Sequence, residues 1–146
     1  MNTIVLKRAT LEDSQEVAKI EKVGNSKTYS SRTKKDEIEN FIKDDFVFLI
    51  KNRETTVGMV SFKITKKKIV HYNGLVIYPK FRSKGFAKKA MFLALRRVSK
   101  YSRIELVVHP HNNSAISLYF SLGFIIEAWK NNYFGDGEPR LVMLKK

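Results

Sequence analysis

The chain has 146 residues and contains no cysteine, which excludes disulfide bonds, thiolate metal sites and a covalent cysteine intermediate. Its three histidines have no carboxylate cluster close to them in the sequence, so we expect no metal site. No apolar run is long enough to cross a bilayer, and no membrane partner is expected. The N-terminus is charged by Lys7, which leaves no apparent signal peptide and favours a cytoplasmic protein.

Acidic residues are missing from the middle of the chain. Residues 55–104 contain no Asp or Glu but thirteen Lys or Arg, whereas ten of the fourteen acidic residues lie before residue 55. The net charge is +14, and the positive field of the middle segment should attract a polyanionic ligand. A nucleic acid would be such a ligand, but no helix-turn-helix or RNA-recognition motif is visible. Nucleic-acid binding therefore stays as an alternative that is not favoured.

The hydrophobic pattern predicts a single domain over residues 1–146 in which strands and helices alternate. Thr10 with Asp13 three residues later is a capping-box pattern, which predicts a helix that ends near Gly24. The other expected helices cover residues 34–43, 86–97 and 113–122. The expected strands cover residues 3–9, 46–51, 55–65, 69–77 and 104–108, followed by two final strands joined through residues 135–137. This order favours an α/β (mixed α+β) fold with a central mixed sheet of about seven strands and helices on both faces.

One motif lies where an apolar strand meets the helix expected over residues 86–97. Pro79 ends the strand, and the turn that follows is rich in cations and places Gly85 at the start of the helix. The first N–H groups of a helix have no intrahelical partner and hold the positive end of its dipole. With Arg82 and Lys84 beside it, this turn predicts a cradle for phosphates. The alternative is an ordinary strand–turn–helix connection with a solvated basic turn.

A second motif begins thirty residues after Arg82 and covers residues 112–124. Asn112 can cap the helix that follows it or bond the amide arm of a cofactor, and both can be true. Tyr119 either lies beside the reacting end of a ligand or is a core aromatic of an amphipathic helix. In this order and at this spacing, the two motifs indicate a site for a pyrophosphate-bearing cofactor with a tyrosine beside its reacting end.

The two motifs resemble the signatures of the GNAT superfamily of N-acetyltransferases. Residues 82–87 match the acetyl-CoA signature Arg/Gln-x-x-Gly-x-Gly/Ala, and residues 112–124 match Asn-x-x-Ala-x-x-Leu-Tyr-x-x-x-Gly-Phe. The Leu-x-Val-x-Pro that usually precedes the first signature is present at residues 75–79, with Ile77 in place of Val. Through residues 132–138 the chain is also similar to the branch that acetylates protein N-termini.

This resemblance implies a GNAT-like enzyme, monomer or homodimer, that moves an acetyl group directly from acetyl-CoA to a primary amine of a peptide, protein or small molecule. A regulatory CoA-binding module without catalysis is an alternative, which the presence of Tyr119 disfavours. The residues that the resemblance implies for acetyl-CoA binding are Leu75, Val76, Ile77, Arg82, Ser83, Lys84, Gly85, Phe86, Ala87, Lys88, Asn112 and Tyr119.

By the same resemblance, the strand ending at Ile77 splays from the next strand, the pantetheine arm lies between them, and the Ile77 N–H points at the thioester oxygen. Tyr119 is the expected general acid, because the pKa of a phenol, near 10, suits proton donation to a departing thiolate.

The general base is expected at His71, where histone-acetylating relatives carry Glu, six residues before Ile77. Strict alternation would place His71, Asn73, Leu75 and Ile77 on one face of the strand. A strand histidine facing solvent or a polar core is the alternative, and so is a base reached through water.

Two further histidines, His109 and His111, flank Pro110 and are candidates as well, although loop residues are the simpler interpretation.

The acceptor is expected between the loop at residues 25–33 and the final hairpin. Tyr133 could wall the acceptor slot, and Asp136 or Glu138 could hold its ammonium group. The alternative is a Gly-Asp-Gly turn followed by a solvated glutamate. The net charge of +14 argues against polyamines and aminoglycosides, which prefer acidic sites.

Overall fold

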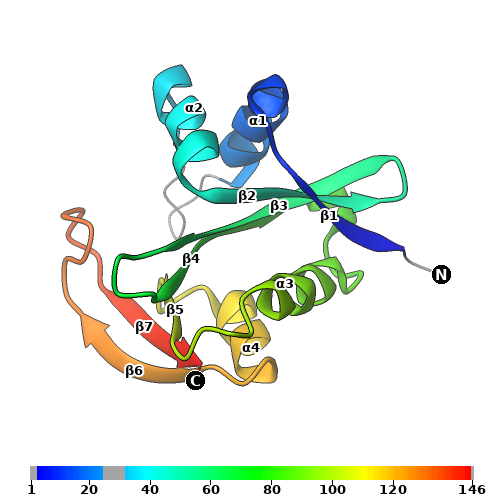
Figure 1. Ribbon diagram of the computed structural model, residues 1–146. Coiled ribbons are helices and arrows are strands. Elements are labelled where there is room, and N and C mark those ends of the chain that lie inside the picture. The colour runs from blue at the N-terminus through cyan, green and yellow to red at the C-terminus, as the bar shows by residue number, and fades with distance from the viewer. Residues whose placement is uncertain (1–2, 25–31, 146) are drawn as a thin grey trace.

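The computed structural model describes residues 3–24 and 32–145 (Figure 1). Each expected helix and strand is present. The strands are β1 (Ile4–Arg8), β2 (Phe46–Asn52), β3 (Thr55–Ile64), β4 (Val70–Ile77), β5 (Ile104–Val108), β6 (Ile125–Lys130) and β7 (Arg140–Lys145). The helices are α1 (Ser14–Gly24), α2 (Lys35–Asp44), α3 (Phe86–Arg97) and α4 (Asn113–Ser121), with short 3-10 turns η1 (Leu11–Asp13) and η2 (Pro79–Phe81).

The seven strands form one sheet in the order β1-β2-β3-β4-β5-β7-β6. β4 and β5 are parallel, and all other neighbouring strands are antiparallel. Figure 1 shows α1 and α2 over one face of the sheet and α3 and α4 over the other. The expected mixed sheet with helices on both faces is therefore confirmed. None of the helices in the described ranges is long and apolar enough to cross a membrane.

Each face of the sheet has its own core, because successive side chains of a strand point to opposite faces. In β2, Phe48 and Ile50 belong to the core beneath α3, which we call the α3 core. Val47 and Leu49, which alternate with them, belong to the core beneath α1 and α2, which we call the α1–α2 core. Both faces of the central strands are therefore buried, which leaves the ends of the strands to form a site.

A β-bulge interrupts β4 in its middle. Phe62 of β3 lies opposite Tyr72, but the preceding Ser61 lies opposite Gly74, so Asn73 is an additional residue on β4. The Asn73 side chain is held at the bulge because the Ser61 hydroxyl donates a hydrogen bond to its Oδ1 at 2.6 Å.

The bulge changes which residues of β4 share a face. Tyr72 before the bulge and Leu75 and Ile77 after it all pack in the α3 core, which strict alternation would not allow. His71, next to Tyr72, lies on the α1–α2 face, which it shares with Val76. Our expectation that His71 shares a face with Leu75 and Ile77 is therefore wrong, because it assumed strict alternation and the bulge adds one residue. Gly74, next to Asn73, is the local sign of the bulge that the expectation did not use.

The parallel strands β4 and β5 part soon after they meet. They pair from Val70 opposite Ile104 to Tyr72 opposite Leu106, and no further pair follows between them. β4 nevertheless continues to Ile77. Beyond Tyr72 the facing backbone edges of the two strands are separated, which confirms the expected splay and opens a slot between them.

Candidate functional site

A cleft of about 1280 Å³ opens at the splay between β4 and β5 and extends over the first turn of α3 and one side of α4. Lys84 is a predicted site residue that does not line this cleft. The predicted site residues that do line it are His71, Leu75, Val76, Ile77, Arg82, Ser83, Gly85, Phe86, Ala87, Lys88, Asn112 and Tyr119. The fold thus brings two sequence motifs, thirty residues apart, to one cleft.

The turn before α3 has a backbone that leaves the start of the helix open. Gly85 is the N-cap with φ of 82° and no side-chain hydrogen bond caps the first turn. Ser83 also has a positive φ, 62°. A Cβ added at Gly85 would meet no atom within 4 Å, so the space beside this glycine is open. The N-terminal N–H groups of α3 are therefore accessible to an anion from the cleft.

The backbone N–H and carbonyl of Ile77 point toward the splay, because the peptide groups of a strand alternate in direction. The next residue, Tyr78, donates its N–H to the Val57 carbonyl of β3 at 2.9 Å. Neighbouring peptide groups of a strand point to opposite edges, so the Ile77 N–H and carbonyl point away from β3. Arg82 Nε donates to that carbonyl at 2.9 Å, which ties the turn before α3 to the end of β4. The same alternation turns the Leu75 N–H toward the splay, a second candidate oxyanion donor that the motif comparison did not single out.

Tyr119 reaches the cleft from α4. Its ring packs against the α3 core and lies 5.7 Å from the ring of Phe124, centroid to centroid. Desolvation raises the pKa of Tyr119 to about 12, so the phenol keeps its proton at neutral pH, as a free phenol does, but is a weaker acid than a free phenol. Asn112 caps α4, since its Oδ1 accepts a hydrogen bond from the Ala115 N–H at 3.4 Å. The N-cap interpretation of Asn112 is confirmed, and cofactor contact by the same side chain stays a prediction.

His71 belongs to a polar network on the α1–α2 face. Its Nδ1 lies 3.4 Å from Glu105 Oε1. Burial lowers the pKa of His71 below its ordinary value, and the hydrogen bond and charge of Glu105 oppose part of that shift. Glu105 also accepts from Arg103 Nε at 3.2 Å, and Arg103 reaches Glu127 at 2.7 Å. The imidazole is therefore neutral at pH 7, with a carboxylate beside the nitrogen that would carry a proton.

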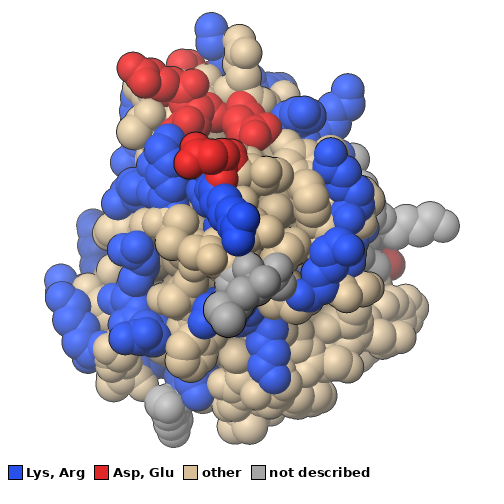
Figure 2. Space-filling model, turned by 90° about the vertical axis from the view of Figure 1, so that its right-hand side faces the viewer, with Lys and Arg blue, Asp and Glu red and all other residues tan. Residues whose placement is uncertain are grey.

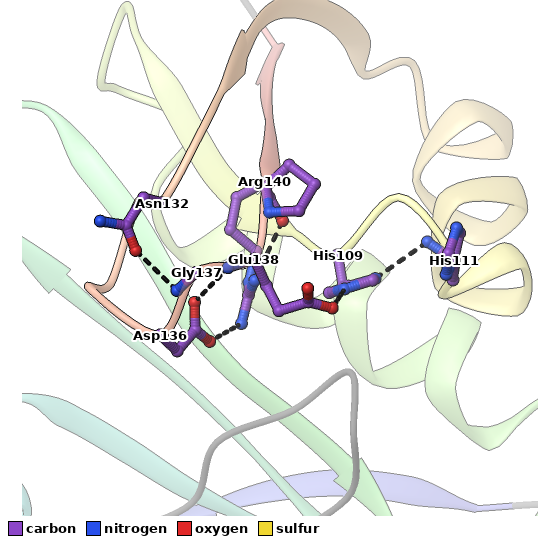
Figure 3. A network of polar contacts seen from close by, with 8 residues as sticks. His109, His111, Asn132, Asp136, Gly137, Glu138 and Arg140 are labelled. Carbon is purple, nitrogen blue, oxygen red and sulfur yellow. Dashed lines mark hydrogen bonds and ion pairs between the residues drawn. The ribbon is translucent and has the colours of Figure 1, made fainter.

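His109 connects the end of β5 to the final hairpin (Figure 3). This buried imidazole accepts the His111 backbone N–H on Nδ1 at 3.0 Å, so its proton is on Nε2, which donates to Glu138 Oε1 at 3.0 Å. Asp136 accepts from Arg140 at 3.0 Å and from the Glu138 N–H at 2.9 Å. Both carboxylates expected to hold an acceptor ammonium already have partners, and that role stays a prediction. His109 and Glu138 are 29 positions apart in the sequence, which explains why no sequence pattern indicated the pair.

Only the end of the other predicted acceptor loop lies within the described residues. There, Arg32 donates its backbone N–H and its guanidinium to the fully buried carboxylate of Glu21, at 2.8 Å and 3.3 Å. The same guanidinium lies 3.6 Å from the centre of the Phe41 ring, and Arg32 lines the cleft. These contacts hold Arg32 at one border of the cleft. The sequence analysis did not identify them, because Glu21 and Arg32 lie eleven positions apart in the chain and no local pattern links them.

Tyr133 and Phe134 lie in the hairpin and line the same cleft, as expected for Tyr133. Their rings are 4.7 Å apart at their centroids, nearly perpendicular, and both are exposed. The hairpin thus provides two aromatic rings to the lining of the cleft that also contains the turn before α3.

Comparisons with known proteins agree with this geometry. The model of the acetyltransferase (GNAT) family matches residues 14–124. A prophage-derived uncharacterized N-acetyltransferase of Bacillus subtilis, YokL, is 31% identical over 94 residues, which are 61% of this chain. The match spans about half of that relative, 53% of its length.

Solved structures share the fold over nearly the whole chain. The ribosomal-protein-S18-alanine N-acetyltransferase of Escherichia coli has a TM-score of 0.79 and 18% identity, with 99% of this chain and 92% of that one covered. The acetyltransferase yncA of Salmonella typhimurium, solved with acetyl-CoA, has a TM-score of 0.81 and 16% identity, with 99% and 94% covered. The match of the family model over most of the chain, together with the splayed strands and the glycine-capped helix, shows that this chain belongs to the acetyltransferase (GNAT) family.

Proposed function

We propose that this chain is an acetyl-CoA-dependent N-acetyltransferase that transfers the acetyl group directly to a primary amine of a peptide, protein or small molecule. The observation that carries the proposal is the convergence of three features on one cleft: the splay of β4 and β5, the open N-terminus of α3 and Tyr119. A CoA-binding module without catalysis would need the first two features but not a protonated phenol at the cleft.

The phosphates of acetyl-CoA would bind the backbone N–H groups at the start of α3. Gly85 leaves space for them, and Ser83, Phe86, Ala87 and Lys88 line the same part of the cleft. Arg82 and Lys84 add positive charge, although Lys84 acts from outside the cleft lining. The pantetheine arm would then extend along the splay past Val76, toward the closed end between β4 and β5.

In the transfer step the amine attacks the thioester carbonyl, an oxyanion develops on that carbonyl, and the thiolate departs. The N–H of Ile77, or that of Leu75, is the donor that we assign to the oxyanion, because both point to the splay. We assign Tyr119 as the acid that protonates the thiolate. The phenol of Tyr119 gives its proton to the departing thiolate sulfur, and CoA leaves as the free thiol.

We assign His71 as the base that accepts the proton of the attacking amine. The bulge places it on the face opposite to the Ile77 side chain, so it approaches the splay from the α1–α2 side while Tyr119 approaches from the α3 side. Glu105 would stabilise the imidazolium that forms. His109 is less suitable, because both of its ring nitrogens already have partners.

We further propose a cytoplasmic enzyme of one domain, monomer or homodimer, that needs no metal. The net charge of +14 favours acceptors that carry acidic groups over polyamines.

A screen of acceptors with detection of released thiol tests the proposal. We expect acetyl-CoA-dependent thiol release with at least one peptide or small amine as the acceptor. With spermidine as the acceptor, we expect no thiol release above the background rate. Product mass must increase by one acetyl group, and a chelator must leave the rate unchanged. Absence of transfer to any member of a broad amine panel, with intact acetyl-CoA binding, would favour the non-catalytic CoA-binding module instead.

A further inference from the structure

The segment between β6 and β7, residues 131–139, makes most of its polar contacts within the hairpin. Asn132 Oδ1 accepts a backbone N–H of the same segment at 2.6 Å. Asp136 accepts from the guanidinium of Arg140 at 3.0 Å. That guanidinium is buried and lies 5.1 Å from the centre of the Phe134 ring. These contacts make the segment one internally linked unit.

A single hydrogen bond joins this unit to β5 (Figure 3). Among the residues that the structure describes, the 3.0 Å contact of Glu138 Oε1 with His109 Nε2 is the one hydrogen bond or ion pair between residues 131–139 and an element other than β6 and β7. His109 directly follows β5 and is 3% exposed. Its other ring nitrogen accepts the His111 N–H at 3.0 Å, so the imidazole is fixed on the β5 side of the contact.

The two ends of the hairpin contact differ in their relation to the cleft. Tyr133, Phe134 and His109 line the cleft, whereas Glu138 does not. The two aromatic rings are 41% and 61% exposed, so they have apolar surface that a ligand in the cleft can cover.

The His109–Glu138 bond favours the hairpin position in which both rings line the cleft. If the hairpin moved away from β5, the buried Nε2–H of His109 would lose its acceptor, and a buried donor without a partner is costly. An interaction that is present in one position of a segment and absent in another shifts the population toward the first.

We propose that Glu138 is a positioning residue for the acceptor amine, because its bond to His109 keeps Tyr133 and Phe134 at the cleft, where their rings contact the acceptor. The inference rests on the proposed function, since the acceptor is the amine of that reaction. This role differs from the contact with an acceptor ammonium that the sequence suggested for Glu138, because its carboxylate does not line the cleft.

Two variants of Glu138 separate the hydrogen bond from the charge. Glu138→Ala removes both, whereas Glu138→Gln keeps an oxygen that can accept from His109 and removes only the charge. Glu54→Ala is the matched control, because Glu54 is an exposed glutamate between β2 and β3 that does not line the cleft. Hydrogen exchange measures the protection of residues 131–139, with α3 as the internal reference for folding. Steady-state kinetics use the peptide or amine with the highest kcat/KM in the acceptor screen.

We expect Glu138→Ala to exchange faster over residues 131–139 and to raise KM for the acceptor about three- to tenfold, the usual range for one hydrogen bond. Its kcat and its KM for acetyl-CoA should stay near the wild-type values, which a general loss of structure would not allow. Glu138→Gln should keep most of the wild-type protection and acceptor KM. Glu54→Ala should match the wild type in every measurement.

Three results would overturn the assignment. Unchanged exchange in Glu138→Ala would show that the bond does not hold the hairpin, and an unchanged acceptor KM would show that the hairpin position does not matter to the acceptor. An equal rise of KM in the Gln and Ala variants would assign Glu138 a direct charge contact with the acceptor instead. Failure of the wild type to acetylate any amine would remove the proposed function, and the exchange data would still decide whether Glu138 holds the hairpin.

Discussion

Burial reinforces the neutral form of the two side chains that we assign to proton transfer. It raises the pKa of Tyr119 to about 12 and lowers the pKa of His71 below its ordinary value. At neutral pH the phenol is therefore an acid that holds its proton, and the imidazole is a base that can accept one. Desolvation shifts each group toward its neutral form, and the neutral form is the one that each role requires.

Replacing Tyr119 by Phe should lower kcat by about a hundredfold or more and leave the affinity for acetyl-CoA nearly unchanged, because proton donation acts in the transition state. Single-turnover acetyl transfer measures the chemical step, and calorimetry measures binding. Circular dichroism would verify that the variant is folded. Wild-type single-turnover rates in Tyr119→Phe would mean that this ring only packs against Phe124.

His71→Gln should slow turnover by about a hundredfold and remove the acidic limb of kcat/KM. Protonation inactivates an imidazole base, so activity falls as the pH drops through its pKa. Since that pKa is lowered, the wild-type limb should lie below about pH 6.5, the ordinary value.

The pH profile of His71→Gln must be recorded with the same acceptor as that of the wild type, because the ionisation of the acceptor amine also produces an acidic limb. If the variant keeps both the rate and the limb, the base lies elsewhere, and His111 or a water chain becomes the better candidate.

Among the elements, the first turn of α3 offers the most specific test. Gly85 has a φ of 82°, a conformation that Asn and Asp tolerate better than other side chains, and the space beside it is open. Gly85→Asn therefore adds bulk without charge, while Gly85→Asp adds the same bulk with a negative charge toward the phosphates. We expect Gly85→Asp to bind acetyl-CoA at least tenfold more weakly than Gly85→Asn, about 1.4 kcal/mol.

Calorimetry on the two Gly85 variants gives that ratio directly. Equal affinities of the Asn and Asp variants would place the phosphates away from this turn, whatever the effect of the added bulk.

Across the whole molecule, acidic side chains are concentrated near α1 and α2, although both helices also carry lysines. Figure 2 shows acidic side chains gathered at the top of one face, where α1 and α2 lie, and Lys and Arg side chains spread over the remainder of that face. This follows the sequence, in which ten of fourteen acidic residues precede residue 55. The positive field should favour the arrival of a polyanionic donor.

Acetyl-CoA binding should therefore weaken as salt rises, since the screening length falls from about 30 Å at 0.01 M to about 3 Å at 1 M. Calorimetry across that range of salt concentration measures how the affinity for acetyl-CoA depends on salt. Salt-independent affinity would contradict charge pairing at the phosphate-binding turn. An electrophoretic shift of nucleic acid that survives saturating acetyl-CoA would support a separate nucleic-acid site.

The sequence alone determined the features that depend on neighbours along the chain. The ends of α3, the N-cap at Asn112 and the glycine at the start of α3 were all predicted. Each rests on propensities and hydrogen bonds among residues a few positions apart, so its physical cause is visible in a short segment.

Contacts between distant segments were decided by the tertiary structure. The bulge at Asn73 moves His71 to the other face, and the register with β3 fixes it, although Gly74 beside it is a local sign of a bulge. The pairs His109–Glu138 and Glu21–Arg32 join segments whose separation in the chain no local pattern encodes. The buried hydroxyl of Tyr72, which has no hydrogen-bond partner among the described residues, is of the same kind, because a residue's burial and partners depend on what the rest of the chain packs around it.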